Sequence, residues 1–121
     1  MSPEPVSPAK PPATIKARRD FLAARRAPSK GTPGFLLVRK DRRDLEPARV
    51  GYTLTKKLGN AVRRNRIRRR LKAVVRDAFP GVASQGCDYI VIARPAAGTR
   101  PYALLLDDMK RALLTLAKSR T

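Results

Sequence analysis

Residues 56–76 read KKLGNAVRRNRIRRRLKAVVR, and this stretch decides which fold the chain can adopt. It holds ten lysines or arginines and no acidic residue. Apolar residues recur with the spacing of one helical face, at Ile67, Leu71, Val74, Val75 and Ala78. The pattern predicts a basic amphipathic helix with one side to bury. Such a helix needs a polyanionic partner, and RNA is the best candidate.

The whole chain carries the same excess of positive charge. Its 121 residues are enough for one domain with a modest core. The formal net charge is +19 and the pI is about 11.6, an excess that destabilises a compact state through self-repulsion. This indicates a chain whose charge is neutralised by phosphates. An anionic membrane is the rival acceptor, but a membrane-surface helix would carry bulky apolar residues opposite its basic face, so we expect no membrane partner.

Cysteine and histidine usage limits the chemistry that the chain itself can perform. Cys87 is the single cysteine, and there is no histidine. An internal disulfide is impossible, a zinc site is not expected, and the commonest general base is missing. No apolar run approaches the ~18 residues of a membrane span, and Met1–Pro8 lacks the apolar core of a signal peptide. We expect a cytoplasmic protein with no catalytic residues and no metal ligands of its own.

The N-terminal third is predicted to contain a tail, a helix and a strand. Residues 1–13 hold five of the eleven prolines and are expected to be a disordered tail. Thr14 is suited to cap a helix that runs to about Arg26. Residues 28–34 are rich in proline and glycine and predict a turn. A strand is expected over 35–40, followed by a polar hairpin loop over 41–47.

The rest of the chain alternates strands and helices. A second strand is expected over 49–56, the basic helix over about 60–79, a third strand over 88–94 and a last helix opened by Pro101. Residues 14–118 would then form one small α+β domain, followed by a flexible C-terminus at 119–121. Its order would be helix, strand, strand, helix, strand, helix, with the helices packed on a short mixed sheet and a βαβ crossover.

The basic helix places cations around most of its circumference. At about 100° per residue, Arg64 and Arg68 flank the apolar stripe on one side, and Arg63, Arg66 and Arg70 flank it on the other. Unpaired N–H groups and the helix dipole would make the first turn a phosphate-binding site. The alternative is a solvated basic face, but 63–76 has no acidic partner and seven arginines to one lysine, a composition that suits phosphate. A DNA-binding basic leucine zipper is a weaker alternative, because no leucine heptads follow, and we expect no DNA partner.

These residues also resemble a known family. The run from Leu58 to Lys72, with its Arg64-Asn65-Arg66 core, is similar to the signature of the bacterial ribonuclease P protein subunit. The flanking stretches 49–60 and 88–95 agree with that family, and Arg19-Asp20-Phe21 resembles its first helix. The likeness covers roughly residues 14–118. It implies a left-handed crossover between the second and third strands, against the general preference for right-handed ones.

The resemblance implies a ribonucleoprotein endonuclease, a hydrolase that removes the 5′ leader from precursor tRNA. The catalyst would be the RNA subunit with bound Mg²⁺, and a monomeric protein would assist. Contacts with the RNA subunit are expected at Lys57, Asn60, Arg63, Arg64, Asn65, Arg66, Arg68, Arg69, Arg70 and Lys72. Contacts with the leader are expected in a cleft between the first helix and the sheet, at Phe21, Arg25, Phe35, Arg39, Thr53 and Lys56.

Two departures and two alternatives qualify the resemblance. Some relatives carry a second aromatic where Arg25 stands and a tyrosine where Val38 stands, so the leader grip would depend more on charge than on stacking. A ribosomal protein would have the same composition, and only the ordered signature separates the two. A self-sufficient protein nuclease is the third interpretation, and the missing histidines argue against it.

Overall fold

The computed structural model describes residues 13–14 and 27–118. It contains five strands, two α-helices and two short 3₁₀ helices in these residues. In chain order they are β1 (Ala13–Thr14), β2 (Ser29–Gly31), β3 (Phe35–Asp41), β4 (Arg49–Thr53), η1 (Lys56–Leu58), α2 (Ala61–Ala78), β5 (Cys87–Ala93), η2 (Pro95–Gly98) and α3 (Tyr102–Lys118). The helix expected over 14–26 lies outside the described residues, apart from Thr14, which belongs to β1.

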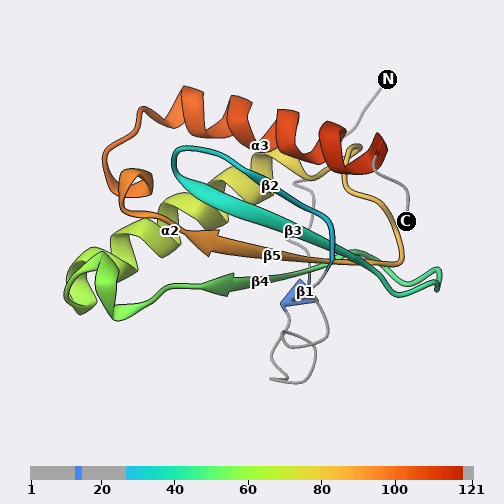
Figure 1. The fold of residues 1–121 in the computed structure, drawn as a ribbon, viewed down its shortest axis with the longest axis horizontal. Helices are drawn as coiled ribbons and strands as arrows, with labels where there is room; N and C mark the ends of the chain where they lie inside the picture. Colours follow the sequence, from blue (N-terminus) through green and yellow to red (C-terminus); the bar gives the residue numbers. More distant parts are fainter. Residues whose placement is uncertain (1–12, 15–26, 119–121) are drawn as a thin grey trace.

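The strands form one mixed sheet in the order β1-β4-β5-β3-β2 (Figure 1). β5 lies in the middle, antiparallel to β3 and parallel to β4. The expected hairpin between the strands at 35–40 and 49–56 is therefore wrong, because β5 separates them. The turn expected at 28–34 is partly wrong as well, since Ser29–Gly31 pairs with β3 as an edge strand. The second strand ends at Thr53, and η1 follows.

The loop between β3 and β4 crosses the end of β5 and is held there by Arg42. Its guanidinium donates to the carboxylates of Asp44 and Asp88 and to the backbone carbonyls of Glu46, Pro47 and Cys87. Asp88, which is buried on β5, also accepts two hydrogen bonds from Arg49, at 2.8 and 2.7 Å. Burial acts to raise the pKa of Asp88, but the hydrogen bonds from Arg49 and Arg42 hold it below its ordinary value. The loop is thus closed by a buried carboxylate shared between two arginines.

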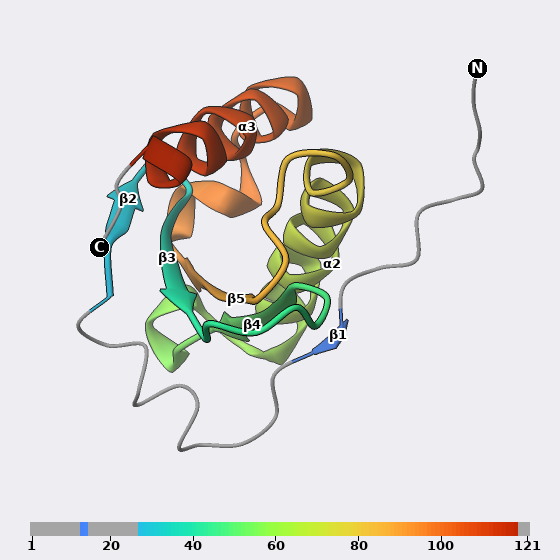
Figure 2. The same cartoon turned by 90° about the vertical axis from the view of Figure 1, so that its right-hand side faces the viewer.

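Both helices cover the same face of the sheet (Figure 2). Alternate residues of the strands point to this face, and they pack with the apolar stripes of the helices. The core includes Phe35, Leu37, Val50, Ile67, Leu71, Tyr89, Val91, Leu105, Met109 and Leu113, all at most 2% exposed. The opposite face carries a small cluster around Val38 and Ile90. The α+β architecture of helices on a mixed sheet is therefore confirmed.

The connection from β4 through α2 to β5 has the uncommon hand. In Figure 1, β4 and β5 both run toward the left, with β5 above β4. Figure 2 looks along these strands, and α2 lies to their right. As the strands run away from the viewer, the chain turns counter-clockwise from β4 through α2 to β5, which is a left-handed crossover. The expectation drawn from the family resemblance agrees with this arrangement.

Candidate nucleic-acid interface

α2 begins abruptly because Gly59 and Asn60 fix its start. Gly59 has φ +123° and ψ −161°, a region open in practice only to glycine. Asn60 then caps the helix, with its Oδ1 accepting from the Arg63 backbone N–H at 2.9 Å. A Cβ on Gly59 would lie 2.7 Å from Cδ of Arg63. The turn therefore also sets the direction in which the Arg63 side chain leaves the helix.

The apolar stripe of α2 fixes which cations face solvent. Ile67, Leu71, Val74, Val75 and Ala78 are all buried, as the sequence predicts. The remaining positions divide into a flank that faces β4, a flank that faces η2 and an outward side. Each carries at least one of the arginines predicted to contact RNA.

The flank that faces β4 contains Arg64, Arg68 and Lys72. The Lys72 ammonium lies 6.0 Å from the ring centroid of Tyr52 on β4, at the limit of a cation–π contact. Asn65 accepts a hydrogen bond from Arg68 at 3.1 Å, which orients that guanidinium along the helix surface. Arg64 is half-buried, and its Nε has no acceptor in the described residues. This flank is therefore a preformed edge of positive charge beside the sheet.

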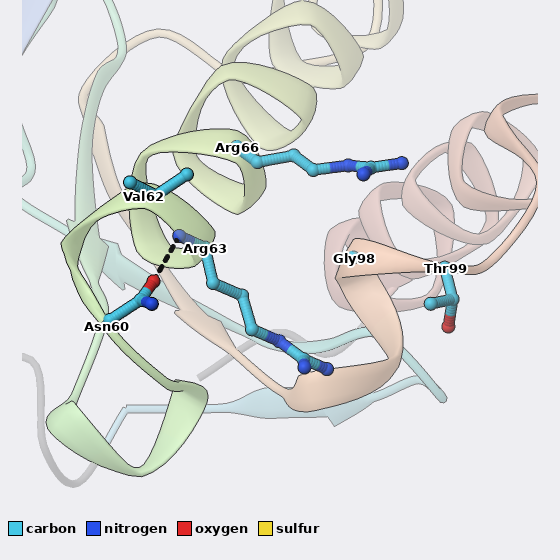
Figure 3. A pocket seen from close by; sticks show the side chains of 6 residues that line it. All are labelled: Asn60, Val62, Arg63, Arg66, Gly98 and Thr99. Carbon is cyan, nitrogen blue, oxygen red and sulfur yellow. Dashed lines mark hydrogen bonds between the residues drawn. The ribbon is translucent and has the colours of Figure 1, made fainter.

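The flank that faces η2 contains Arg63, Arg66 and Arg70. Arg70 donates to the backbone carbonyls of Gly98 and Arg100. It holds the segment after η2 against the helix, which gives Arg70 a structural role, and its RNA contact stays a prediction. Arg63 and Arg66 extend toward the same segment (Figure 3). Neither guanidinium has a hydrogen bond or ion pair to another described residue.

A hollow of about 280 Å³ opens between the first turns of α2 and η2. No acidic residue lines it; its wall consists of Asn60, Val62, Arg63, Arg66, Gly98 and Thr99 (Figure 3). Gly98 and Thr99 were missed in the sequence, because only the tertiary packing of η2 against α2 brings them to the helix. No local pattern around residues 98–99 signals this contact.

The outward side of α2 contains Arg69 and, in the last turn of the helix, Arg76. Arg69 is exposed and has no ion pair within the described residues. Arg76 instead pairs with Asp77 at 3.1 Å. Asp77 is the first acidic residue of α2, so every charged side chain before it on the helix is positive. The positive end of the helix dipole lies at the start of the same stretch. The N-terminal end of α2 is therefore suited to bind phosphates.

The four predicted leader contacts that the structure describes do not share one surface. Phe35 is 0% exposed within the core under the helices; it has no face left for stacking on a base, so that expectation is wrong. Arg39 alternates with the core residue Leu37 and pairs across the sheet with Tyr89, so it also points to the helix side. Thr53 lies on the opposite face, and Lys56 is exposed on η1. Phe21 and Arg25 lie outside the described residues.

The carboxylates of the described residues do not fit a metal centre. No group of three or more Cys, Asp or Glu among residues 27–118 is placed to hold an ion. The two buried carboxylates, Asp88 and Asp108, are each engaged by two arginines. Neither α2 nor α3 is both long enough and apolar enough to cross a membrane.

The structure defines a class of protein: a small α+β domain that presents one cation-rich helix beside a left-handed βαβ unit. The family model described as Ribonuclease P matches residues 10–117, and the chain belongs to this bacterial family. It is 45% identical over 104 residues to the ribonuclease P protein component of Caulobacter vibrioides, covering 85% of this chain and 70% of the relative. It is 44% identical over 106 residues to that of Ruegeria pomeroyi, covering 84% of each.

Solved structures agree with this assignment. The fold is similar to the ribonuclease P protein of Staphylococcus aureus, with a TM-score of 0.71, 27% identity and coverage of 87% of this chain and 94% of the other. It is also similar to that of Thermotoga maritima, with a TM-score of 0.67, 25% identity and coverage of 89% and 97%. Family membership makes the chain a protein component of ribonuclease P, a tRNA-processing endoribonuclease.

Proposed function

We propose that α2 binds the RNA subunit of ribonuclease P through its exposed cations. The observation that carries the proposal is the contrast within one helix. Residues 61–75 include no acidic residue, whereas Arg76 beyond them is paired with Asp77. Guanidinium groups suit phosphates because their planar N–H donors can bind two oxygens at once. The contact set comprises Lys57, Asn60, Arg63, Arg64, Asn65, Arg66, Arg68, Arg69 and Lys72, with Arg70 supporting it from behind.

Charge reversal at Arg66 or Arg69 tests this interface. We expect Arg66→Glu or Arg69→Glu to abolish binding of the RNA subunit at physiological salt in a filter assay, because a phosphate contact becomes a repulsion. Replacing one of these arginines by alanine should also make RNA binding less sensitive to salt. The slope of log K for binding against log salt concentration should become shallower by about one.

Lys118→Glu is the matched control for charge reversal. Lys118 is exposed at the far end of α3 and undergoes the same change in net charge. Lys118→Glu should reduce the affinity for RNA by less than about threefold, because a distant exposed charge is screened by salt. If the three charge-reversal variants weaken binding equally, the interface is not on α2.

The protein also grips the 5′ leader of precursor tRNA in this proposal. Phe21 and Arg25 are the candidate contacts that lie outside the described residues. Thr53 and Lys56 are candidates near the end of β4, and the buried Phe35 is excluded. Phe21→Ala should weaken binding of leader-bearing precursor tRNA more than binding of mature tRNA, in line with ~1–3 kcal/mol for one stacked base. Equal losses for both substrates would refute the leader contact.

The chemistry belongs to the RNA subunit in this proposal. Magnesium supplies activation of water and stabilises developing charge in phosphodiester hydrolysis, and it would be held by RNA and substrate, since the described carboxylates do not fit an ion. The protein would act as a cytoplasmic monomer within the ribonucleoprotein, without DNA or membrane partners. Purified chain should not cleave precursor tRNA alone, and cleavage without RNA would overturn this division of labour.

A further inference from the structure

The hollow between α2 and η2 combines two kinds of surface in one place. Arg63 and Arg66 supply positive charge, and Val62 beside them is 78% exposed. An apolar side chain exposed to this degree gains little from folding, so it is available to contact a ligand. The backbone of Gly98 and the hydroxyl-bearing Thr99 complete the wall.

The wall opposite the arginines is rigidly placed. Gly98 is buried against Ile67: a Cβ there would lie 3.4 Å from Cγ1 of Ile67, which is itself 0% exposed. Arg70 fixes the following residues through the carbonyls of Gly98 and Arg100. The hollow therefore exists before any ligand arrives, which reduces the entropy lost on binding.

We propose that this hollow binds one unpaired nucleotide of the RNA subunit, with its phosphate between the two arginines and its base against the apolar rim. The inference rests on the proposed function and specifies which kind of RNA element the helix meets. A volume of about 280 Å³ lies just below the ~300–1,000 Å³ that is usual for ligand sites. A hollow this small suits a single nucleotide better than a base-paired step. Bases in loops and bulges are free to leave the stack and pack on arginine planes and apolar groups, whereas bases within a duplex are not.

Blocking the hollow from the η2 side tests the site without replacing the arginines. Thr99→Glu places a carboxylate at the mouth, and Ala117→Glu makes the same charge change at an exposed position near the end of α3. We expect Thr99→Glu to weaken binding of the ribonuclease P RNA at least about tenfold, because a like charge then faces the phosphate. Ala117→Glu should change affinity less than about twofold. Both positions are exposed, and thermal unfolding verifies that both variants stay folded.

A second measurement identifies the ligand as a nucleotide. A photo-crosslinking benzophenone side chain at position 62 should label one unpaired nucleotide in the full-length protein–RNA complex. Replacing that nucleotide by an abasic one should weaken binding as much as Val62→Ala does, up to about tenfold for the loss of two buried methyl groups. The two losses should not add, because both remove the same contact.

The outcomes separate this inference from the proposed function. In one outcome, the wild type binds the RNA, the Arg66 and Arg69 variants do not, and Thr99→Glu has the same affinity as Ala117→Glu. That outcome would mean that α2 binds RNA but that the hollow is not used. Crosslinks confined to paired nucleotides, or an abasic RNA of unchanged affinity, would likewise overturn the inference. Absence of binding by the wild type would overturn the proposed function itself.

Discussion

The two ends of the molecule use arginine in opposite ways. At the loop between β3 and β4, the Arg42 side chain is 14% exposed and all its nitrogens donate to protein oxygens. Along the first half of α2, the guanidiniums of Arg63, Arg66 and Arg69 have no hydrogen bond or ion pair to another described residue. The same residue type thus closes a loop at one end and faces outward at the other.

The difference lies in where the chain places its few carboxylates. Asp41, Asp44, Glu46 and Asp88 gather around the crossing loop, and α2 has no carboxylate before Asp77. A buried charge without a partner is expensive, so the loop arginines need internal acceptors. An exposed arginine tolerates water, and its acceptors can be supplied by another molecule. The distribution of acids therefore separates the loop arginines, which are paired within the protein, from the exposed arginines of α2, whose acceptors another molecule can supply.

Removing the carboxylate of Asp88 should have the largest effect on stability. Asp88→Asn deprives Arg42 and Arg49 of a shared buried counter-charge, and the loss of one partner from such a group costs about 3–5 kcal/mol. We expect a fall of about 3 kcal/mol in the free energy of unfolding, measured with urea at pH 7. Affinity for RNA should stay within about twofold under conditions where the variant is folded.

The control is the pH dependence of the difference in unfolding free energy between wild type and Asp88→Asn. The pKa of Asp88 is lowered in the folded state, so its contribution is present above the ordinary Asp value of about 3.9. That contribution is lost as the pH falls through the lower folded-state pKa. The gap in stability between wild type and Asp88→Asn should therefore narrow in acid. A gap that is constant from pH 7 to pH 3 would show that the charge of Asp88 is not its cause.

A smaller effect is expected from Gly59→Ala at the other end. The backbone conformation of Gly59 costs a residue with a Cβ of order 1–3 kcal/mol, and the new methyl would press on the Arg63 side chain. We expect a stability loss in that range together with weaker RNA binding, because Arg63 is redirected. Chemical unfolding and filter binding measure the two effects.

Gly81→Ala is the matched variant for this test. Gly81 also has a positive φ, of +77°, but a Cβ there meets nothing within 4 Å. It should lose about 1–2 kcal/mol of stability and retain RNA affinity. If both variants bind RNA equally well, the direction of Arg63 does not matter for the interface.

Local signals were sufficient for α2 and α3, the two α-helices that the structure describes. The cap at Asn60 and the stop at Pro80-Gly81 bracket α2, and the buried stripe of α2 matches the predicted apolar positions. Pro101 likewise precedes α3. These features depend on residues within a turn or two of each other, so sequence spacing predicts them well.

Sheet pairing and side-chain orientation depended on distant residues. Nothing near residues 41–47 indicates that β5, which follows only after the whole of α2, inserts between β3 and β4. The Pro- and Gly-rich stretch at 28–34 looks like a turn, yet Ser29–Gly31 pairs along β3. Phe35 and Arg70 carry residue types suited to RNA, but their burial and backbone contacts arise only when α2, α3 and the sheet assemble.

The central place of β5 constrains how the domain forms during synthesis. β3 and β4 leave the ribosome well before residues 87–93, the strand that both require as a neighbour. Until then α2 has no finished sheet on which to bury its apolar stripe. Such long-range pairing slows folding. The domain therefore has to fold as one unit once nearly all of it has been translated, and not strand by strand.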